Sequence, residues 1–445
     1  MEKRTVLPFF ILATVPFIMV LGNSMLIPVF PLMEERLQLT QFQVGLLVTA
    51  FSVPAGIVIP FAGAVSDYVG RKKVMFPALL LYGLGGLAAG FAAWLLANPY
   101  PWILGGRIVQ GLGAGGTYQI ALALAGDQFQ GGERTKAVGI LEAANGLGKV
   151  VSPIAGAALG LLVWFGPFFA YGILAIPIAF AIWLLVREPK VERQSKKPSD
   201  YIRSLGPIFQ AKGVPLAITY FTGAVGLFLL FGLLSFISDE IEARHAITGV
   251  VKGLILAVPV TVMTVVAYTS GLFLEKRTKW LKSVMIAGLS LTVGGLLGLA
   301  FWSSLTALIG FASVMGLGIG LMLPALNTLI TGATDADERG LITALYGTVR
   351  FFGVAVGPPA FGLVQTYGDL TMFLGGAAIA GVALVLVSFF VHTEKILADE
   401  AASADRQHQP KAESRCVVFD PDEAMPARET KKAERRGLLH DDCHF

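Results

Sequence analysis

Twelve long apolar stretches dominate the chain, and each can cross the ~30 Å hydrocarbon core of a bilayer as one helix. Unpaired backbone groups are too costly in lipid for such stretches to cross as irregular chain. The approximate limits are 6–30, 43–65, 74–96, 101–125, 137–161, 164–186, 214–237, 249–273, 281–302, 304–330, 341–364 and 369–391. Hydrophobic residues make up 55% of the 445 residues and charged residues only 14%, which excludes an ordinary soluble domain. We therefore predict an all-α polytopic membrane protein with twelve transmembrane helices.

Two parts of the chain repeat in parallel. The connection after the second stretch reads GAVSDYVGRKK over residues 63–73, and the connection after the eighth begins GLFLEKR at Gly271, an offset of 208. A Glu-Arg pair at 133–134 recurs at 338–339, an offset of 205. Duplicated six-helix halves are typical of secondary transporters. We predict four regions: an N-terminal six-helix bundle (1–186), a cytoplasmic linker between the halves (187–212), a C-terminal six-helix bundle (213–391) and a disordered cytoplasmic tail (392–445).

The basic residues indicate how the chain is oriented. If the N-terminus is cytoplasmic, Lys and Arg crowd the cytoplasmic connections, whereas the external connections hold only Arg36 and Arg244. This asymmetry follows the positive-inside rule. We expect a multi-pass protein of the inner (plasma) membrane, in contact with the lipid bilayer, with both termini in the cytoplasm.

Several kinds of chemistry find no support in the sequence. The two cysteines, Cys416 and Cys443, lie in the tail and provide neither a disulfide framework nor a metal-ligand spacing. The glycine-rich run at 111–116 lies within an apolar stretch and lacks the Gly-Lys-Ser/Thr of a nucleotide loop, so ATP-driven pumping has no support. We expect no enzyme activity, no cofactor, no metal and no nucleic-acid partner.

The turn at 63–73, with its degenerate copy, resembles the signature of the major facilitator superfamily, and the resemblance covers about residues 5–391. It implies two pseudo-symmetric six-helix bundles and transport by alternating access. Glycines permit a tight turn and close helix approach, and a carboxylate there can accept hydrogen bonds from a cation. The cluster is expected to latch the cytoplasmic side in one state; the alternative is a basic turn without a gating role. The residues concerned are Gly63, Asp67, Gly70, Arg71, Lys72, Glu275 and Arg277.

The fourth stretch carries a second resemblance. Residues 107–116 read RIVQGLGAGG, which is similar to the conserved arginine segment of proton-coupled members of the superfamily. An intramembrane arginine is costly and usually faces a cavity or a partner. The resemblance implies a role for Arg107 in proton coupling. The alternative is that Arg107, close to the start of the helix, extends to the outer interface.

The fifth stretch resembles the antiporter motif of drug:proton exporters. Its residues are Gly139, Gly148, Ser152, Pro153 and Gly156. Ser152 stands where the family usually has Gly, and Ala after Gly156 is a second departure. Small residues let helices approach closely, and proline bends a helix. The resemblance implies export, and ordinary packing of a membrane helix is the competing interpretation.

The same stretch holds a polar face. Glu142, Asn145, Lys149 and Ser152 recur at steps of three and four residues, so they share one side of a helix. Polar groups at this depth are expected to face a water-filled cavity. We predict that Glu142, together with Arg107, takes part in proton coupling. Alternatively, Glu142 and Lys149 belong to a neutralised network that only stiffens the bundle.

A second intramembrane cation lies in the eleventh stretch. Arg350 matches Asn145 at the offset of 205, so the pseudo-symmetry places Arg350 across a central cavity from the polar face of the fifth stretch. The first stretch lacks the acidic residue that many multidrug exporters carry, which weakens the case for a lipophilic cation as substrate. The residues predicted to line the substrate cavity are Asn23, Asn145, Lys149, Asn327 and Arg350.

These features together predict a secondary active transporter that exports amphiphilic small molecules in exchange for protons, similar to a multidrug efflux protein. One alternative is an exporter of an anionic metabolite, a siderophore or a lipid-linked precursor. Another is a membrane receptor or scaffold that signals through the tail. The expected partners are a small-molecule substrate, the proton and the lipid bilayer, and the chain is expected to act as a monomer.

Overall fold

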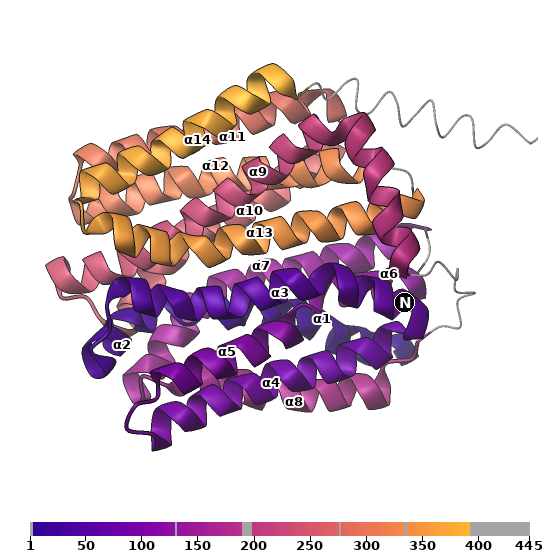
Figure 1. The fold of residues 1–445 in the computed structure, drawn as a ribbon, viewed down its shortest axis with the longest axis horizontal. Coiled ribbons are helices and arrows are strands. Elements are labelled where there is room, and N and C mark those ends of the chain that lie inside the picture. The colour runs from indigo at the N-terminus through magenta and orange to yellow at the C-terminus, as the bar shows by residue number, and fades with distance from the viewer. Residues whose placement is uncertain (1–2, 130, 189–197, 276, 333–335, 392–445) are drawn as a thin grey trace, which may run out of the picture. The chain divides into compact units, whose positions relative to one another are not determined.

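The computed structural model describes residues 3–129, 131–188, 198–275, 277–332 and 336–391. Within these ranges the regular structure is helical, and Figure 1 shows two groups of helices. The N-terminal group contains α1 (Lys3–Ser24), the 3-10 helix η1 (Ile27–Val29), α2 (Phe30–Leu37), α3 (Gln41–Val69), α4 (Arg71–Leu95), α5 (Tyr100–Ala114), α6 (Tyr118–Gln128), α7 (Gly131–Leu162) and α8 (Gly166–Leu185). The C-terminal group contains α9 (Pro198–His245), α10 (Gly249–Glu275), the 3-10 helix η2 (Thr278–Trp280), α11 (Leu281–Phe301), α12 (Leu305–Thr331), α13 (Ala336–Gln365) and α14 (Asp369–Phe390).

The predicted helical membrane fold is confirmed. In the described part of the chain, eleven helical segments are long and apolar enough to cross a membrane. The remaining predicted stretch, 101–125, is divided into α5 and α6. The division falls at a Gly-Gly pair that packs tightly: a Cβ on Gly115 would lie 2.7 Å from the carbonyl oxygen of Ala55, and one on Gly116 would lie 2.8 Å from the Cβ of Ala78. Close approach to α3 and α4 therefore accompanies the interruption of this helix.

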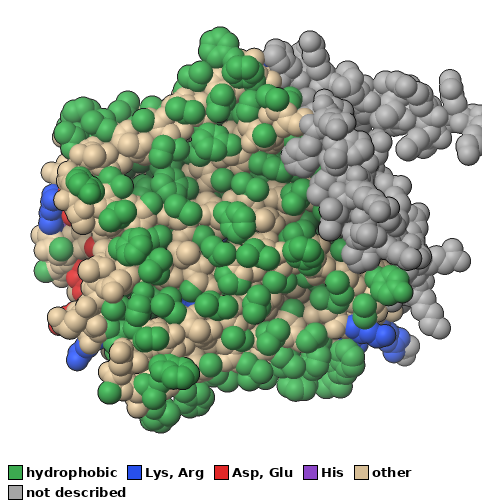
Figure 2. Space-filling model, in the orientation of Figure 1, with side chains coloured by type: hydrophobic (Ala, Val, Ile, Leu, Met, Phe, Trp, Pro, Cys, Tyr) green, Lys and Arg blue, Asp and Glu red, His purple; other side chains and the backbone are tan. Residues whose placement is uncertain are grey.

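The side surface of the helices is apolar. Phe61 and Leu184, for example, are 60% and 75% exposed. In the face drawn in Figure 2, hydrophobic side chains cover the length of the helices, and the coloured charged side chains lie towards two opposite ends, apart from a small blue patch near the middle. Exposed apolar side chains on helices of this length are satisfied by lipid. The chain is a multi-pass membrane protein.

The two groups meet along equivalent helices. α3 contacts α13, and α7 contacts α10, so the second and fifth predicted stretches face the eleventh and eighth. Side-chain hydroxyls join the backbones: Thr348 donates to Gly56 O at 2.8 Å, and Thr49 donates to Ala355 O at 2.6 Å. This pairing is the one that a parallel duplication would give.

The helix bundle has two ends, here named the turn end and the far end. The turn end carries residues 66–73, and the far end carries residues 34–43 and 239–252. α9 begins at Pro198 and runs for 48 residues, so residues 198–212 of the predicted linker form the start of a helix. Residues 189–197 of that linker lie outside the described residues, as does the predicted tail with its two cysteines.

Candidate functional site

A cavity of about 120 Å³ lies between the two groups of helices. Helices α1, α3, α6 and α7 line it on one side, and α9, α10 and α13 line it on the other. Four of the five residues predicted for a substrate cavity reach it: Asn23, Asn145, Lys149 and Arg350. The fifth, Asn327, is exposed on α12 and does not line the cavity. That these residues bind substrate stays a prediction.

Lys149 and Arg350 give the cavity its charge. They come from opposite groups, Lys149 from α7 and Arg350 from α13, and the two cations interact electrostatically. The guanidinium of Arg350 lies 5.3 Å from the ring of Tyr346, and its buried Nε has no hydrogen-bond partner among the described residues. None of the described residues that line the cavity is Asp or Glu. The cavity therefore favours an acidic or anionic group.

The rest of the lining is apolar and aromatic. Phe51, Phe231 and Phe351 lie among aliphatic side chains from α1, α9 and α10. An apolar wall with a few charged groups suits a ligand that has both apolar surface and a charged group.

Glu142 is connected to the cavity through Tyr118. The Tyr118 hydroxyl donates a 2.5 Å hydrogen bond to Glu142 Oε1, and Tyr118 itself lines the cavity. Glu142 is exposed, and it forms no ion pair with Lys149. Glu142 and Lys149 nevertheless interact electrostatically, so the alternative of a neutralised network that stiffens the bundle stays open. Tyr118 was not predicted from the sequence, although its place directly after the Gly115–Thr117 interruption is a signal that could have identified it.

Arg107 does not extend to the membrane interface. Its side chain is fully buried, which excludes the alternative raised from the sequence. Its guanidinium donates to the carbonyl of Leu47 at 3.0 Å, to Gln110 Oε1 at 2.6 Å and to Asn23 Oδ1 at 2.7 Å. It also lies 4.5 Å from the ring of Phe51. Neutral oxygens and a π-face thus compensate this cation. Asn23 lines the cavity, so its hydrogen bond with Arg107 connects the buried guanidinium to the cavity wall.

The small residues of α7 explain how it packs. A Cβ on Gly148 would lie 2.9 Å from Phe17 O of α1, and one on Gly156 would lie 2.0 Å from the O of Met25, directly after α1, so both positions require glycine. Gly139 differs, because a Cβ there would meet nothing within 4 Å. The close approach expected of this motif therefore applies to Gly148 and Gly156 and not to Gly139.

Two further residues of the motif lie between these glycines. Pro153 lines the cavity, and its carbonyl oxygen lies 2.6 Å from the place of a Cβ on Gly253 of α10. The hydroxyl of Ser152 donates to Gly148 O at 2.5 Å within the helix. α7 thus contacts both α1 and α10 closely while it forms one wall of the cavity.

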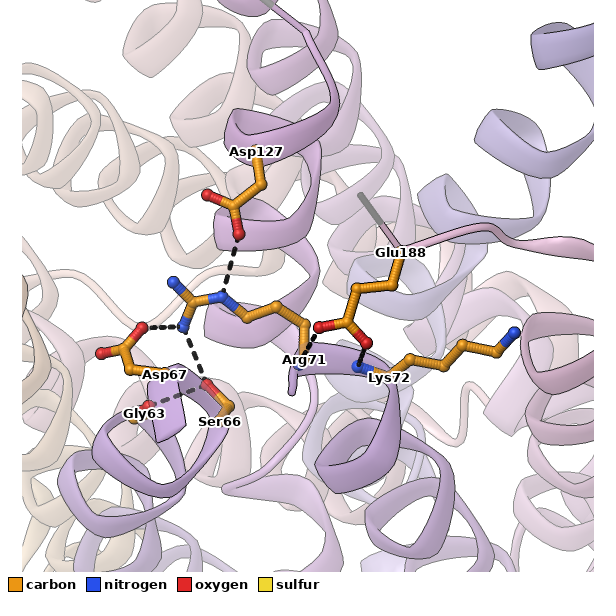
Figure 3. Close-up of polar contacts among 7 residues, drawn as sticks. All are labelled: Gly63, Ser66, Asp67, Arg71, Lys72, Asp127 and Glu188. Atoms are coloured by element: carbon orange, nitrogen blue, oxygen red, sulfur yellow. Dashed lines mark hydrogen bonds and ion pairs between the residues drawn. The ribbon is translucent and has the colours of Figure 1, made fainter. Parts of the chain in front are cut away.

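The cationic turn at 63–73 forms a cluster around Arg71 (Figure 3). The guanidinium contacts the carboxylate of Asp67, donates to Ser66 Oγ at 2.8 Å and to Asp127 Oδ2 at 3.2 Å. Arg71 therefore joins the ends of α3, α4 and α6. Glu188, after α8, accepts hydrogen bonds from the backbone N–H groups of Arg71 at 2.7 Å and Lys72 at 3.3 Å, which satisfies the start of α4.

The glycines of this turn have different roles. Gly70 has φ 124°, a conformation that only glycine adopts readily, so the turn requires it. Gly63 was expected to permit close helix approach, but a Cβ there would meet nothing within 4 Å. That expectation was wrong, because Gly63 faces open space. Of the second copy of the turn, Arg277 lies over Phe273 at 5.0 Å, and the side chain of Glu275 lies outside the described residues.

Comparisons with known proteins identify transporters as the relatives of this chain. A family model described as Major Facilitator Superfamily matches residues 12–282 and 241–425. The bacillibactin exporter of Bacillus subtilis (strain 168) is 39% identical over 386 residues, which cover 86% of this chain and 96% of that protein. The multidrug efflux protein YfmO of the same organism is 26% identical over 372 residues, covering 80% and 88%.

A solved structure shares the fold. The chain matches a bacterial homolog of the human lysosomal transporter Spinster, crystallised in an inward-facing and occupied conformation, with a TM-score of 0.66 and 18% identity. The match covers 91% of this chain and 98% of that one.

Proposed function

The chain belongs to the Major Facilitator Superfamily, and on this premise we propose that it exports an amphiphilic small molecule bearing an acidic group, in exchange for protons. The observation that carries the proposal is the composition of the central cavity. Lys149 and Arg350 supply two cations, aromatic side chains supply apolar surface, and no carboxylate among the described residues lines the wall. A ligand with both an apolar surface and an acidic group matches these features.

A siderophore is the substrate class favoured here. The relative with 39% identity over most of both chains is a bacillibactin exporter, which supports a substrate of this kind. Siderophores carry dissociable oxygen ligands for iron, and such oxygens suit a cavity with two cations.

Export of a wider range of drugs is a second candidate. The apolar lining of the cavity and the relatives named as multidrug efflux or resistance proteins favour it. The two candidates differ in the charge of the substrate. A cationic drug would meet repulsion from both Lys149 and Arg350, whereas an acidic ligand would be attracted.

Alternating access follows from the arrangement of the two groups. The excess of Lys and Arg at the turn end supports a cytoplasmic location for that end. Hydrogen bonds from Thr49 to Ala355 O and from Ser238 to Ile27 O then lie between the cavity and the outside, and exposed Glu142 lies on the cytoplasmic side. Thr348 also donates to Gly56 O nearer the turn end, so the two groups are joined on both sides of the cavity, and transport requires each end to open in turn.

Glu142 is the proposed proton site. Its carboxyl can exchange a proton on the exposed side. The hydrogen bond that it accepts from Tyr118 links the carboxyl to the cavity wall.

An efflux panel tests the proposed function. Cells with and without the gene are loaded with bacillibactin, with an anionic dye conjugate and with a lipophilic cationic dye, each with and without a protonophore. The proposal predicts gene-dependent efflux of bacillibactin or of the anionic conjugate, abolished by the protonophore. Gene-dependent efflux of the cationic dye alone would favour the second candidate, and efflux that persists with the protonophore would refute coupling to protons.

A further inference from the structure

A second set of charged side chains lies at the far end, where the two groups of helices meet. It is separate from the cavity, none of whose lining residues belongs to it. The residues come from four helices: Glu34 from α2, Gln41 from α3, Asp239 and Glu242 from α9, and Lys252 from α10. α2 and α3 belong to the N-terminal group, and α9 and α10 belong to the C-terminal group. The cluster therefore spans the interface that must part if the far end opens.

The contacts within this cluster leave acceptors without donors. Lys252 is 2% exposed, and its ammonium lies 2.6 Å from Glu242 Oε2. Gln41 donates from Nε2 to Asp239 Oδ2. Glu34 Oε1 and Asp239 Oδ1 are buried and have no hydrogen-bond partner among the described residues. These two carboxyl groups also interact electrostatically with each other.

The charges explain why this arrangement is unusual. Three carboxylates face one ammonium, so full ionisation would leave two uncompensated negative charges in a covered site. Like charges that are buried together cannot both stay ionised at low cost, and an unpaired buried acceptor carries a desolvation penalty. One proton on either carboxyl removes one charge and supplies an O–H donor.

Among the described residues, the other charged groups at the far end do not pair with Glu34 or Asp239. Arg36 is exposed at the rim, in a neighbouring pocket that Glu242 and Lys252 also line. Glu240, on the same helix as Asp239, is paired with Arg244 at 2.9 Å. Arg244 also contacts Asp369 Oδ2 at 3.0 Å, so this cation is shared by two carboxylates of the C-terminal group, and His245 of the same helix also interacts with Glu240.

We propose that Glu34 and Asp239 together bind one proton that holds the far end closed. Opening would separate the two carboxyl groups, expose both to water and let both ionise. Acid in the compartment at the far end therefore favours the closed state, and alkaline conditions favour opening. This site is distinct from Glu142 and goes beyond the proposed function, because it controls a conformational equilibrium whatever the substrate is.

Distances across the far end test this proposal. Asn98 and Ser303 are exposed in far-end loops of opposite groups, so spin labels at Asn98→Cys and Ser303→Cys report how far apart the groups are. Cys416→Ser and Cys443→Ser remove the native thiols. We expect the short-distance population of the purified full chain in lipid nanodiscs to increase when the pH falls from about 8 to about 5.5. A distance distribution that does not change with pH in the wild-type background would overturn the proposal.

Substitutions of Glu34 and Asp239 test whether these two residues cause the pH dependence of the far-end distance. Glu34→Gln and Asp239→Asn resemble the protonated groups, so either should favour the short distance at both pH values and abolish the pH response. Glu35→Gln is the matched control, because Glu35 is the next residue of α2 and is exposed. It should respond as the wild type does. A normal response in both Glu34→Gln and Asp239→Asn would contradict the assignment even if the wild type responds to pH.

One further variant separates this site from the proposed transport function. Glu142→Gln should keep the far-end pH response, because Glu142 takes no part in the cluster. If the far-end response fails while Glu142→Gln still abolishes coupled transport, only the far-end site is refuted. If the response persists while Glu142→Gln transports normally, only the role of Glu142 is refuted.

Discussion

The Tyr118 hydroxyl donates a 2.5 Å hydrogen bond to Glu142 Oε1, and it does so from a helix that begins directly after an interruption in the fourth predicted span. Tyr118 lines the cavity and Glu142 is exposed, so the pair connects an exposed carboxyl group with the cavity. A change in the charge of Glu142 alters the hydrogen bond that Tyr118 makes. The pair thus offers a direct physical route from proton binding to the shape and polarity of the cavity.

Tyr118→Phe should uncouple transport from the proton gradient. The change keeps the ring and removes the hydroxyl, at a cost of about 1.5–3 kcal/mol for a hydrogen bond to a charged group. We expect substrate accumulation driven by a pH difference to fall strongly, while substrate affinity changes little. Transport into inside-out vesicles at several imposed pH differences measures this. Wild-type dependence on the pH difference would show that the hydrogen bond is dispensable.

Lys149→Gln and Arg350→Gln should each weaken acidic substrates. Loss of one hydrogen bond to a charged group corresponds to on the order of 1–3 kcal/mol, or roughly 5- to 150-fold in affinity. A lipophilic cationic dye should be unaffected or transported better, because a repulsive charge is removed. The comparison uses one anionic conjugate and one cationic dye with each variant. Parallel loss of both substrates would indicate a structural charge network, and no change in either would place these cations outside the substrate path.

Asp67→Asn should slow turnover without much effect on affinity. Asp67 pairs with Arg71 at the turn end, remote from the cavity, and this partly exposed ion pair contributes on the order of 0.5–1 kcal/mol. A two- to five-fold loss of maximal rate is therefore expected, measured from the substrate dependence of efflux. Lys73→Gln is the control, since Lys73 is an exposed basic residue of the same turn. A large change in affinity at unchanged rate would argue against a latch.

Two glycines of the same turn should respond in opposite ways to alanine. Gly70→Ala forces a side chain into a backbone with φ 124° and should lower the stability by about 1–3 kcal/mol. Gly63→Ala adds a methyl group that meets nothing within 4 Å of its Cβ and should be neutral or stabilising, by about 0.5–1 kcal/mol. Thermal unfolding of the purified variants in detergent separates the two. Equal destabilisation would mean that the conformation of Gly70 is not the reason for glycine there.

The sequence allowed the fold and much of the cavity to be predicted, for a physical reason. Polar side chains in the middle of an apolar span usually face a cavity, because exposure to lipid is costly. The repeat related α7 to α13. Asn145, Lys149 and Arg350 could therefore be brought together before any coordinates were known. Asn327 satisfied the same reasoning but lies exposed near the end of α12.

Other features depend on packing between distant segments. Glycine alone does not reveal whether another helix lies against it, which is why Gly63 and Gly139 were grouped with the tightly packed Gly156. The far-end carboxyls were missed because Glu34 and Asp239 lie near the ends of apolar stretches, where water is the expected partner. Carboxyl oxygens of Glu34 and Asp239 become buried because the two groups of helices pack together at the far end.

Proton binding at Glu142 is proposed to drive export, and transport by purified protein in liposomes provides the test. A pH difference is imposed, and the accumulation of substrate against its own gradient is followed for wild type, for Glu142→Gln and for the control Glu35→Gln. Glu142→Gln keeps the shape of the side chain and removes the titratable group. We expect wild type and the control to concentrate substrate, whereas Glu142→Gln should only exchange it down its gradient. Accumulation by Glu142→Gln at the wild-type level would show that the proton site lies elsewhere.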